Sequence, residues 1–185
     1  MDEGGGRIVV GVDGSPSSHR ALRWATQRAK LTGASLEVVT CWEFPVTYNW
    51  SPPYRPIGVD LARDAHGKLQ RTVAEALGDD PGVDIKLTVV DGHAAPVLLD
   101  AAKGASLLVV GSRGHGAFTG MLLGSVSDHC VRHASCPVIV VRGAGDKESG
   151  HSGSSTHELF RPYRRPSSLL GRASSWFPSI IVATR

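Results

Sequence analysis

Short runs of apolar residues recur along the first 143 residues, and segments with helical spacing separate them. Most runs are apolar on consecutive residues, so both faces of the predicted strand must be buried, as in a parallel sheet covered on both sides. The separating segments place apolar residues every three or four positions, which is typical of helices with one buried face. This alternation predicts an α/β fold with a mostly parallel sheet and right-handed crossovers.

We expect five strands and four helices in this part of the chain. The predicted strands are Arg7–Asp13, Leu36–Trp42, Val83–Val90, Ser106–Gly111 and Cys136–Arg142. The predicted helices run from Pro16 to about Gly33 and over Val59–Leu77, Ala94–Lys103 and Met121–His133. Ser15 can cap the first helix and Gly33 can end it. The pattern predicts a Rossmann-like domain with a five-stranded parallel sheet in the order 3-2-1-4-5 and helices on both faces.

The pattern ends near Gly143. We therefore expect one domain over residues 1–143 and a disordered, flexible tail over residues 144–185, which are rich in Ser, Gly, Pro and basic residues. Residues 1–143 contain 14 Lys and Arg and 14 Asp and Glu, so the tail carries the whole net charge of +3. A domain with balanced charge is not a general binder of polyanions, and we expect no nucleic-acid partner.

Composition also bears on the compartment. No apolar run approaches the roughly 18–20 residues that a membrane helix needs. Residues 1–6 lack the basic and apolar regions of a secretory leader. Cys41, Cys130 and Cys136 show no paired spacing, which is typical of reduced thiols. We expect a cytoplasmic protein that does not bind membranes.

Two distinctive loops follow the first and fourth predicted strands. The first contains Asp13, and the second is the glycine-rich stretch Gly111–Gly120. In an open parallel sheet of this order, ligands bind at the carboxyl ends of the strands, where the strand order reverses. The two loops should therefore converge on one crevice. A carboxylate such as that of Asp13 is suited to accept hydrogen bonds from ribose hydroxyls.

The glycine-rich loop has the spacing Gly111-x2-Gly114-x9-Gly124-Ser125, which suits an anionic ligand. Glycine lets the backbone turn and approach a phosphate closely. The first amides of the following helix, together with the hydroxyls of Ser125 and Ser127, can donate to phosphate oxygens. The Gly-Lys-[Ser/Thr] sequence of a P-loop is missing, which argues against fast phosphoryl transfer.

Other clusters have plainer interpretations. His129 and His133 are four residues apart and flank Cys130, but this spacing is too sparse for a zinc site, and we expect an ordinary helix face. Ser127, Asp128 and His129 are adjacent in sequence and cannot face one another on a helix, so they form no catalytic triad. We predict no metal site and no catalytic residue.

Two features leave alternatives open. The segment Phe44–Gly58 is rich in Pro and aromatic residues and is long for a connection, which suggests a lid. Its aromatic side chains either stack on a base or cover an apolar edge. His115, in the glycine-rich loop, either contacts a terminal phosphate or faces solvent.

Taken together, these motifs resemble the universal stress protein family over residues 7–143. The resemblance is carried by Ile8–Ser15, Gly92–Pro96, Gly111–Gly116, Leu122–Ser127 and Cys136–Val141. The glycine-rich loop matches the G-x2-G-x9-G-[S/T] pattern of the family's ATP-binding branch at every position. The resemblance implies an adenine-nucleotide-α-hydrolase-like fold and a regulatory module that binds ATP, with or without Mg²⁺, in the stress response.

The resemblance also implies roles for individual residues. Asp13 would meet the ribose, and the main chain around Val39–Cys41 would meet the adenine. The loop residues after the fourth strand would line ribose and phosphates, and the start of the next helix would hold the phosphates. The implied ATP site comprises Gly11, Val12, Asp13, Ser15, Val39, Cys41, Gly111, Ser112, Arg113, Gly114, His115, Gly116, Gly124, Ser125, Val126 and Ser127.

Members of the family often form homodimers through the last strand, here Pro137–Val141, and an apolar edge strand needs a partner. Two alternatives to the binding module stay open. One is a slow Mg²⁺-dependent ATPase, and the other is a dimeric interaction protein that does not need nucleotide. Because the sequence offers no clear general base near a γ-phosphate, binding is favoured over hydrolysis.

Overall fold

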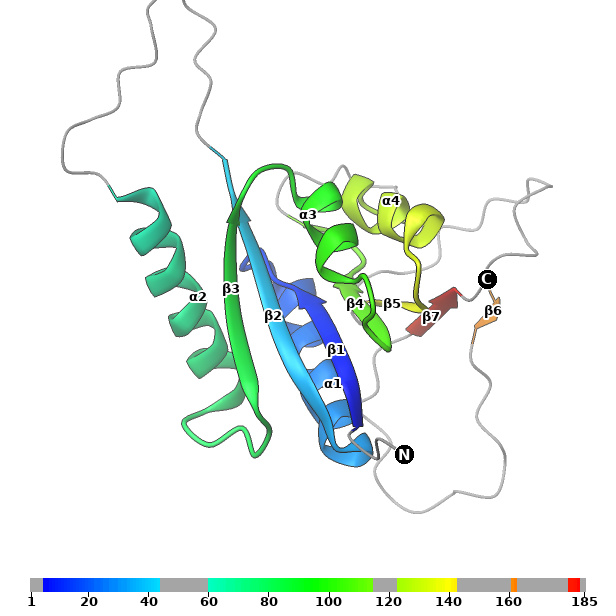
Figure 1. Ribbon diagram of the computed structural model, residues 1–185, viewed down its shortest axis with the longest axis horizontal. Coiled ribbons are helices and arrows are strands. Elements are labelled where there is room, and N and C mark those ends of the chain that lie inside the picture. The colour runs from blue at the N-terminus through cyan, green and yellow to red at the C-terminus, as the bar shows by residue number, and fades with distance from the viewer. Residues whose placement is uncertain (1–4, 44–59, 115–122, 143–160, 163–179, 184–185) are drawn as a thin grey trace, which may run out of the picture.

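The computed structural model describes residues 5–43, 60–114, 123–142, 161–162 and 180–183. Its strands are β1 (Gly5–Gly11), β2 (Ala34–Trp42), β3 (Ile85–Asp91), β4 (Leu107–Gly111), β5 (Val138–Val141), β6 (Arg161–Pro162) and β7 (Ile180–Ala183). Its helices are α1 (Pro16–Thr32), α2 (Leu61–Leu77), α3 (Ala94–Ala101) and α4 (Ser125–His133). All described strands belong to one sheet (Figure 1).

The first five strands are parallel and follow the order β3-β2-β1-β4-β5, which confirms the predicted topology. Strand β1 pairs with β2 on one side and with β4 on the other. The chain therefore reverses its direction of travel across the sheet between β1 and β4. Ligands bind at such a reversal in open α/β sheets, on the carboxyl side of the strands.

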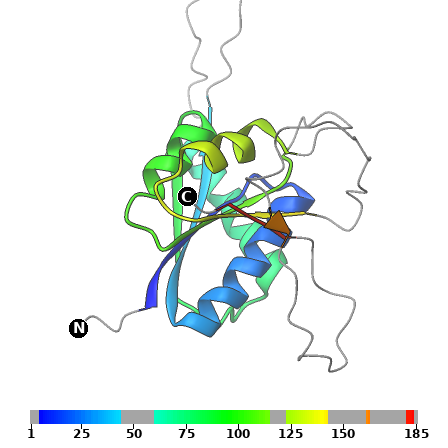
Figure 2. The same cartoon turned by 90° about the vertical axis from the view of Figure 1, so that its right-hand side faces the viewer.

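Helices cover both faces of the sheet, and alternate residues of each strand face opposite layers (Figures 1 and 2). On β1, Val10 packs in the layer formed with α1 and α2, whereas Val9 packs in the layer formed with α3 and α4. Both side chains have no exposed surface. Burial on both faces explains why these strands are apolar on consecutive residues.

The ends of α1 follow the sequence prediction. Ser15 is the N-cap and accepts a hydrogen bond from the amide of Ser18, and Pro16 is the first helical residue. Gly33 ends the helix with φ 68°, a left-handed conformation that favours glycine. Ser15 thus fixes the point at which α1 leaves the carboxyl edge of the sheet, and Gly33 fixes its end just before β2.

Two predicted helix starts are corrected. Helix α4 begins at Ser125 rather than Met121, because Gly124 at its N-cap has an extended backbone; residues 115–122 lie outside the described residues. Helix α2 begins at Leu61 rather than Val59, because the carboxylate of Asp60 accepts from the amide of Arg63 and caps the helix. The predicted lid, Phe44–Gly58, also lies outside the described residues.

The sheet continues beyond β5 into the segment that the sequence analysis treats as a tail. Strand β7 pairs antiparallel with β5 along the full length of both, and β6 pairs antiparallel with β7. The Ile-Ile-Val-Ala sequence of β7 has high β propensity, and the edge of β5 offers unpaired backbone groups. The apolar edge thus finds a partner within the same chain.

Among the helices that the structure describes, none combines the length and the apolar character needed to cross a bilayer.

Candidate functional site

The loops after β1 and β4 meet at the carboxyl edge of the sheet, as the topology predicts. Asp13 and Gly114 lie side by side there: a Cβ atom added to Gly114 would overlap the Oδ2 atom of Asp13. Glycine at position 114 therefore leaves room for this carboxylate. The sequence analysis assigned the glycine to close approach of a phosphate; the structure adds a second reason for it within the protein.

The carboxylate of Asp13 is held by its own loop. Its Oδ1 atom accepts a hydrogen bond of 2.9 Å from the amide of Ser15, while the residue as a whole is exposed. Gly14 between them has φ 84°, a conformation that a residue with a side chain rarely adopts. The tight turn after β1 thus orients an accessible carboxylate beside the glycine-rich loop.

The N-terminus of α1 is joined directly to the loop after β4. The hydroxyl of Ser17 donates to the carbonyl of Arg113, and the hydroxyl of Ser15 lies 3.4 Å from the same oxygen. A Cβ atom on Gly111 would lie 2.6 Å from Oγ of Ser17. Gly111 is therefore required by the packing of α1 against β4. Ser17 could not be found from the sequence, because its partner, Arg113, lies 96 residues further along the chain.

The start of α4 is also joined to the loop after β4. The amide of Gly124 donates to the carbonyl of Ser112 at 2.7 Å, and the hydroxyl of Ser127 donates to this carbonyl at 3.0 Å. Ser127 is buried, so its placement argues against the expected donation from its hydroxyl to a phosphate. Ser125, the first residue of α4, is exposed at the same end of the helix.

Beside Asp13, strand β2 continues past the end of β1. The amide of Val12 donates to the carbonyl of Val39 at 2.9 Å, and the pairing of β1 with β2 ends there. The next residues of β2, as far as Trp42, pair with β3 alone. Main-chain groups near Cys41 therefore lie at the carboxyl edge, where adenine is expected from the sequence. Burial raises the pKa of the Cys41 thiol to about 11, with a smaller contribution from Glu43.

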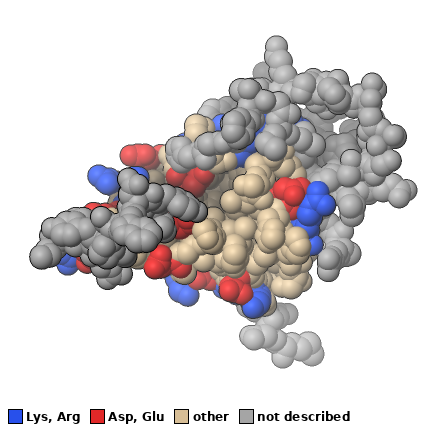
Figure 3. Space-filling view, turned by 90° about the horizontal axis from the view of Figure 1, so that it is seen from above, with Lys and Arg blue, Asp and Glu red and all other residues tan. Residues whose placement is uncertain are grey.

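Viewed onto the carboxyl edge, the described surface carries few charged side chains at its centre, and acidic and basic groups lie around it (Figure 3). Val126 is half-buried in the first turn of α4, and Gly11 precedes the turn that carries Asp13. Two residues expected in the site, His115 and Gly116, lie outside the described residues. The described part of this edge thus combines backbone and hydroxyl groups with the carboxylate of Asp13.

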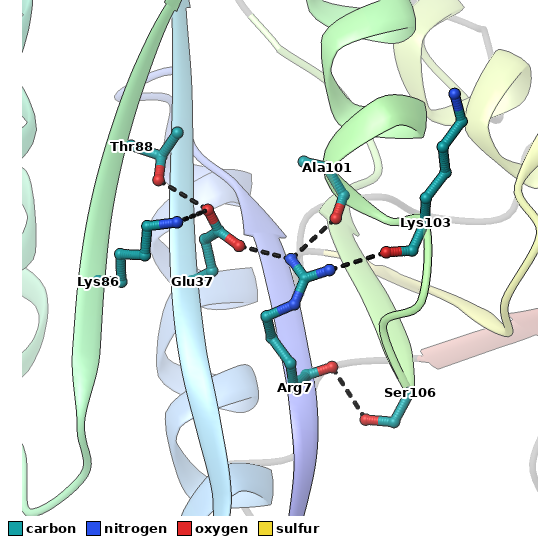
Figure 4. Close-up of polar contacts among 7 residues, drawn as sticks. All are labelled: Arg7, Glu37, Lys86, Thr88, Ala101, Lys103 and Ser106. Atoms are coloured by element: carbon teal, nitrogen blue, oxygen red, sulfur yellow. Dashed lines mark hydrogen bonds and ion pairs between the residues drawn. The ribbon is translucent and has the colours of Figure 1, made fainter.

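A second polar cluster lies toward the amino ends of the strands, on the face covered by α3 (Figure 4). Glu37 of β2 is buried and forms ion pairs with Arg7 at 2.5 Å and with Lys86 at 3.0 Å. Thr88 donates to the same carboxylate at 2.8 Å. Burial alone would raise the pKa of Glu37, but hydrogen bonds from Thr88, Lys86 and Arg7 outweigh it and lower the pKa.

Arg7 also connects this cluster to the end of α3. Its guanidinium donates to the carbonyls of Ala101 and Lys103 at 2.9 and 2.8 Å (Figure 4). The carbonyl of Arg7 accepts from the hydroxyl of Ser106 at 3.0 Å. The guanidinium and the Glu37 carboxylate therefore have partners within the protein, so this cluster serves the fold.

The two histidines of α4 contact each other. The rings of His129 and His133 are exposed and stack with centroids 4.2 Å apart. Nδ1 of His133 lies 2.9 Å from the carbonyl of His129. Within the described ranges, no group of three or more His, Cys, Asp or Glu residues is arranged to hold a metal ion.

Comparison with known proteins gives consistent matches. The family model described as the universal stress protein family matches residues 6–142. A universal stress protein of Mycolicibacterium smegmatis is 37% identical over 149 residues, covering 78% of this chain and 50% of that protein. One from Mycobacterium tuberculosis is 35% identical over 139 residues, covering 72% and 46%. The chain thus spans about half the length of these relatives.

Solved structures of similar fold agree. A universal stress protein crystallised in complex with cAMP is 31% identical, has a TM-score of 0.52, and is covered to 94% by 73% of this chain. UspA from Lactobacillus plantarum is 26% identical, has a TM-score of 0.60, and is covered to 98% by 75% of this chain. The sheet order, the two converging loops and these matches agree: the chain belongs to the universal stress protein family.

Proposed function

We propose that this chain binds an adenine nucleotide, ATP in the first place, at the carboxyl edge between β1 and β4. The observation that carries the proposal is the contact between Asp13 and Gly114, which joins the two loops at the reversal of strand order. The cAMP complex of a universal stress protein with 31% identity supports a nucleotide as the class of ligand.

The residues present fit such a ligand. The exposed carboxylate of Asp13 suits ribose hydroxyls, and Gly114, which leaves room for that carboxylate, is itself exposed at the same edge. Amides at the start of α4, with Ser125, would donate to phosphate oxygens. The main chain near Cys41 would meet the adenine.

Mg²⁺ would accompany the phosphates rather than occupy a cage of protein ligands. One oxygen of Asp13 already accepts from the amide of Ser15, and Mg²⁺ usually binds through one or two carboxylates plus phosphates. The ion would neutralise phosphate charge when bound. The sequence offers no clear general base near a γ-phosphate, which favours a regulatory binding module of the stress response over an ATPase.

The proposal is tested by calorimetric titration of the full chain with Mg-ATP and with adenosine. We expect Asp13→Ala and Gly114→Ala each to weaken ATP binding by at least about tenfold. This is the effect of losing about one hydrogen bond to a charged group. Asp100→Ala is the matched control, because this exposed aspartate of α3 pairs with Lys103 at the surface. Unchanged affinity in both site variants, or no binding by the parent chain, would reject the site.

Two further expectations are also proposals. A cytoplasmic location follows from the sequence argument alone. A homodimer through Pro137–Val141 would require the second copy to take the place of β7, which pairs with β5 in this structure. Native mass spectrometry of the full chain would measure the number of subunits and of bound nucleotides together.

A further inference from the structure

We infer that Ser17 is a positioning residue for the phosphates: its hydroxyl fixes the peptide between Arg113 and Gly114, so that the Gly114 amide can donate to an anion. The inference rests on the proposed nucleotide site and goes beyond it, because Ser17 lies outside every motif that identified that site. Ser17 acts through the loop and does not itself need to touch the ligand.

Ser17 contacts the loop after β4 directly. Ser17 is 6% exposed and is the second residue of α1, where its hydroxyl donates to the carbonyl of Arg113. A Cβ on Gly111 would lie 2.9 Å from the carbonyl carbon of Ser17, so β4 and α1 pack too closely there for a side chain. Both ends of the Gly111–Gly114 turn are thus fitted to the first turn of α1.

Peptide geometry extends this contact to the ligand side. A trans peptide is planar, and its N–H points opposite to its C=O; the described chain contains no cis peptide bond. Because the carbonyl of Arg113 faces the first turn of α1, the amide of Gly114 points away from it. Among the described residues this amide has no hydrogen-bond acceptor, and Gly114 is exposed. It is therefore available to a phosphate oxygen.

The neighbouring serine provides a matched control. Ser18 is also buried, at 3% exposure, and also carries a hydroxyl in the first turn of α1. Its hydroxyl, however, donates to the carbonyl of Ser15 at 2.9 Å, within its own turn. Removing the hydroxyl of Ser18 therefore removes a buried hydrogen bond of α1 and leaves the loop after β4 in place.

The test is a calorimetric titration of the full-length parent, Ser17→Ala and Ser18→Ala with Mg-ATP and with adenosine. We expect Ser17→Ala to weaken ATP binding by about tenfold and adenosine binding by less than about twofold. Ser18→Ala should bind both ligands like the parent. A Ser17→Ala variant that binds ATP like the parent, or that loses ATP and adenosine to the same degree, would overturn the inference.

A second measurement needs no variant. In ¹H–¹⁵N spectra of the parent chain, the Gly114 amide should shift with ATP and with pyrophosphate and stay in place with adenosine. A Gly114 amide that ignores ATP would also overturn the inference. If the parent binds no nucleotide, both the proposed function and the inference are rejected. If the parent binds and Asp13→Ala does not, normal binding by Ser17→Ala defeats the inference alone.

Discussion

The two polar clusters on the sheet differ in what their polar groups contact. Around Glu37, the carboxylate and the guanidinium of Arg7 are satisfied by neighbours within the protein, which connect three strands to the end of α3. At the carboxyl edge, hydroxyls fix the loops to one another, while Asp13 and Gly114 are exposed.

The polar groups that stabilise the fold and those proposed to bind a ligand thus lie at different places on one sheet. Removing the partner of a buried charge costs several kcal/mol of unfolding free energy. The cluster around Glu37 therefore stabilises the pairing of the strands, and its charged groups are already engaged within the protein. A loop fixed by hydroxyls and glycines can present backbone donors without first reorganising. Variants at the two places should therefore fail in different ways, one in folding and the other in binding.

The largest effect is expected from Arg7→Ala. The substitution removes an ion pair with Glu37, whose side chain is 8% exposed, and two hydrogen bonds to the end of α3. We expect a loss of about 3 kcal/mol in the free energy of unfolding, measured by urea denaturation. Lys86→Ala, which removes a 72% exposed partner, should cost less than about 1 kcal/mol. Equal losses in the two variants would contradict the role given to burial.

Gly111→Ala should affect both properties. The added Cβ would lie 2.6 Å from Oγ of Ser17, so α1 or β4 must shift, at a cost of about 1–2 kcal/mol in unfolding free energy. ATP affinity should fall with it, because the same shift moves the loop. Gly124→Ala is the control for stability alone, because Gly124 belongs to the proposed site: its nearest neighbour would be 3.4 Å away, and its φ of −74° suits alanine. A tolerated Gly111→Ala would contradict the packing described here.

A smaller effect is expected from pH. The pKa of Glu37 is lowered in the folded protein, so its ion pairs stabilise the fold above the ordinary value of 4.5. This contribution is lost as the pH falls through the lowered pKa, because the native carboxylate must then be protonated. Unfolding free energy measured from pH 6 to pH 3 should fall more steeply for the parent than for Glu37→Gln. Parallel curves would refute the assignment.

The smallest effect concerns thiol reactivity. Burial raises the pKa of Cys41 to about 11 and that of Cys130 to about 12. At pH 8 only about one Cys41 in a thousand is a thiolate, so its reaction with a disulfide reagent should be slow. ATP should slow Cys41 further, because this residue lies at the carboxyl edge, and should leave Cys136 unchanged. Protection of Cys136 instead would point to a ligand at the opposite edge.

Local patterns predicted most of the fold. The strand order, the Ser15 cap and the Gly33 stop follow from apolar runs and from helix-boundary residues, which act over a few positions. The adjacency of Asp13 and Gly114 could be predicted because topology brings the carboxyl ends of β1 and β4 together. The Ser17–Arg113 contact could not, because a serine in the first turn of a helix shows no sign of its partner across the sheet. The network of Arg7 and Glu37 depends on strand register in the same way.

The β5 edge shows another limit of the sequence. Apolar character predicted that the edge needs a partner, but not which segment provides it. In the structure that partner is β7, more than 35 residues beyond β5 along the chain. Pairing between strands depends on the whole set of available edges, which no local pattern records.

The most direct test of the account is amide mapping of the full chain by ¹H–¹⁵N spectroscopy during a titration with Mg-ATP. If the nucleotide binds at the carboxyl edge, we expect saturable shifts that cluster at Asp13, Gly114 and Ser125, with little change at Glu37 and Lys86. Absence of saturable shifts, or shifts concentrated around Glu37 and Lys86, would contradict it.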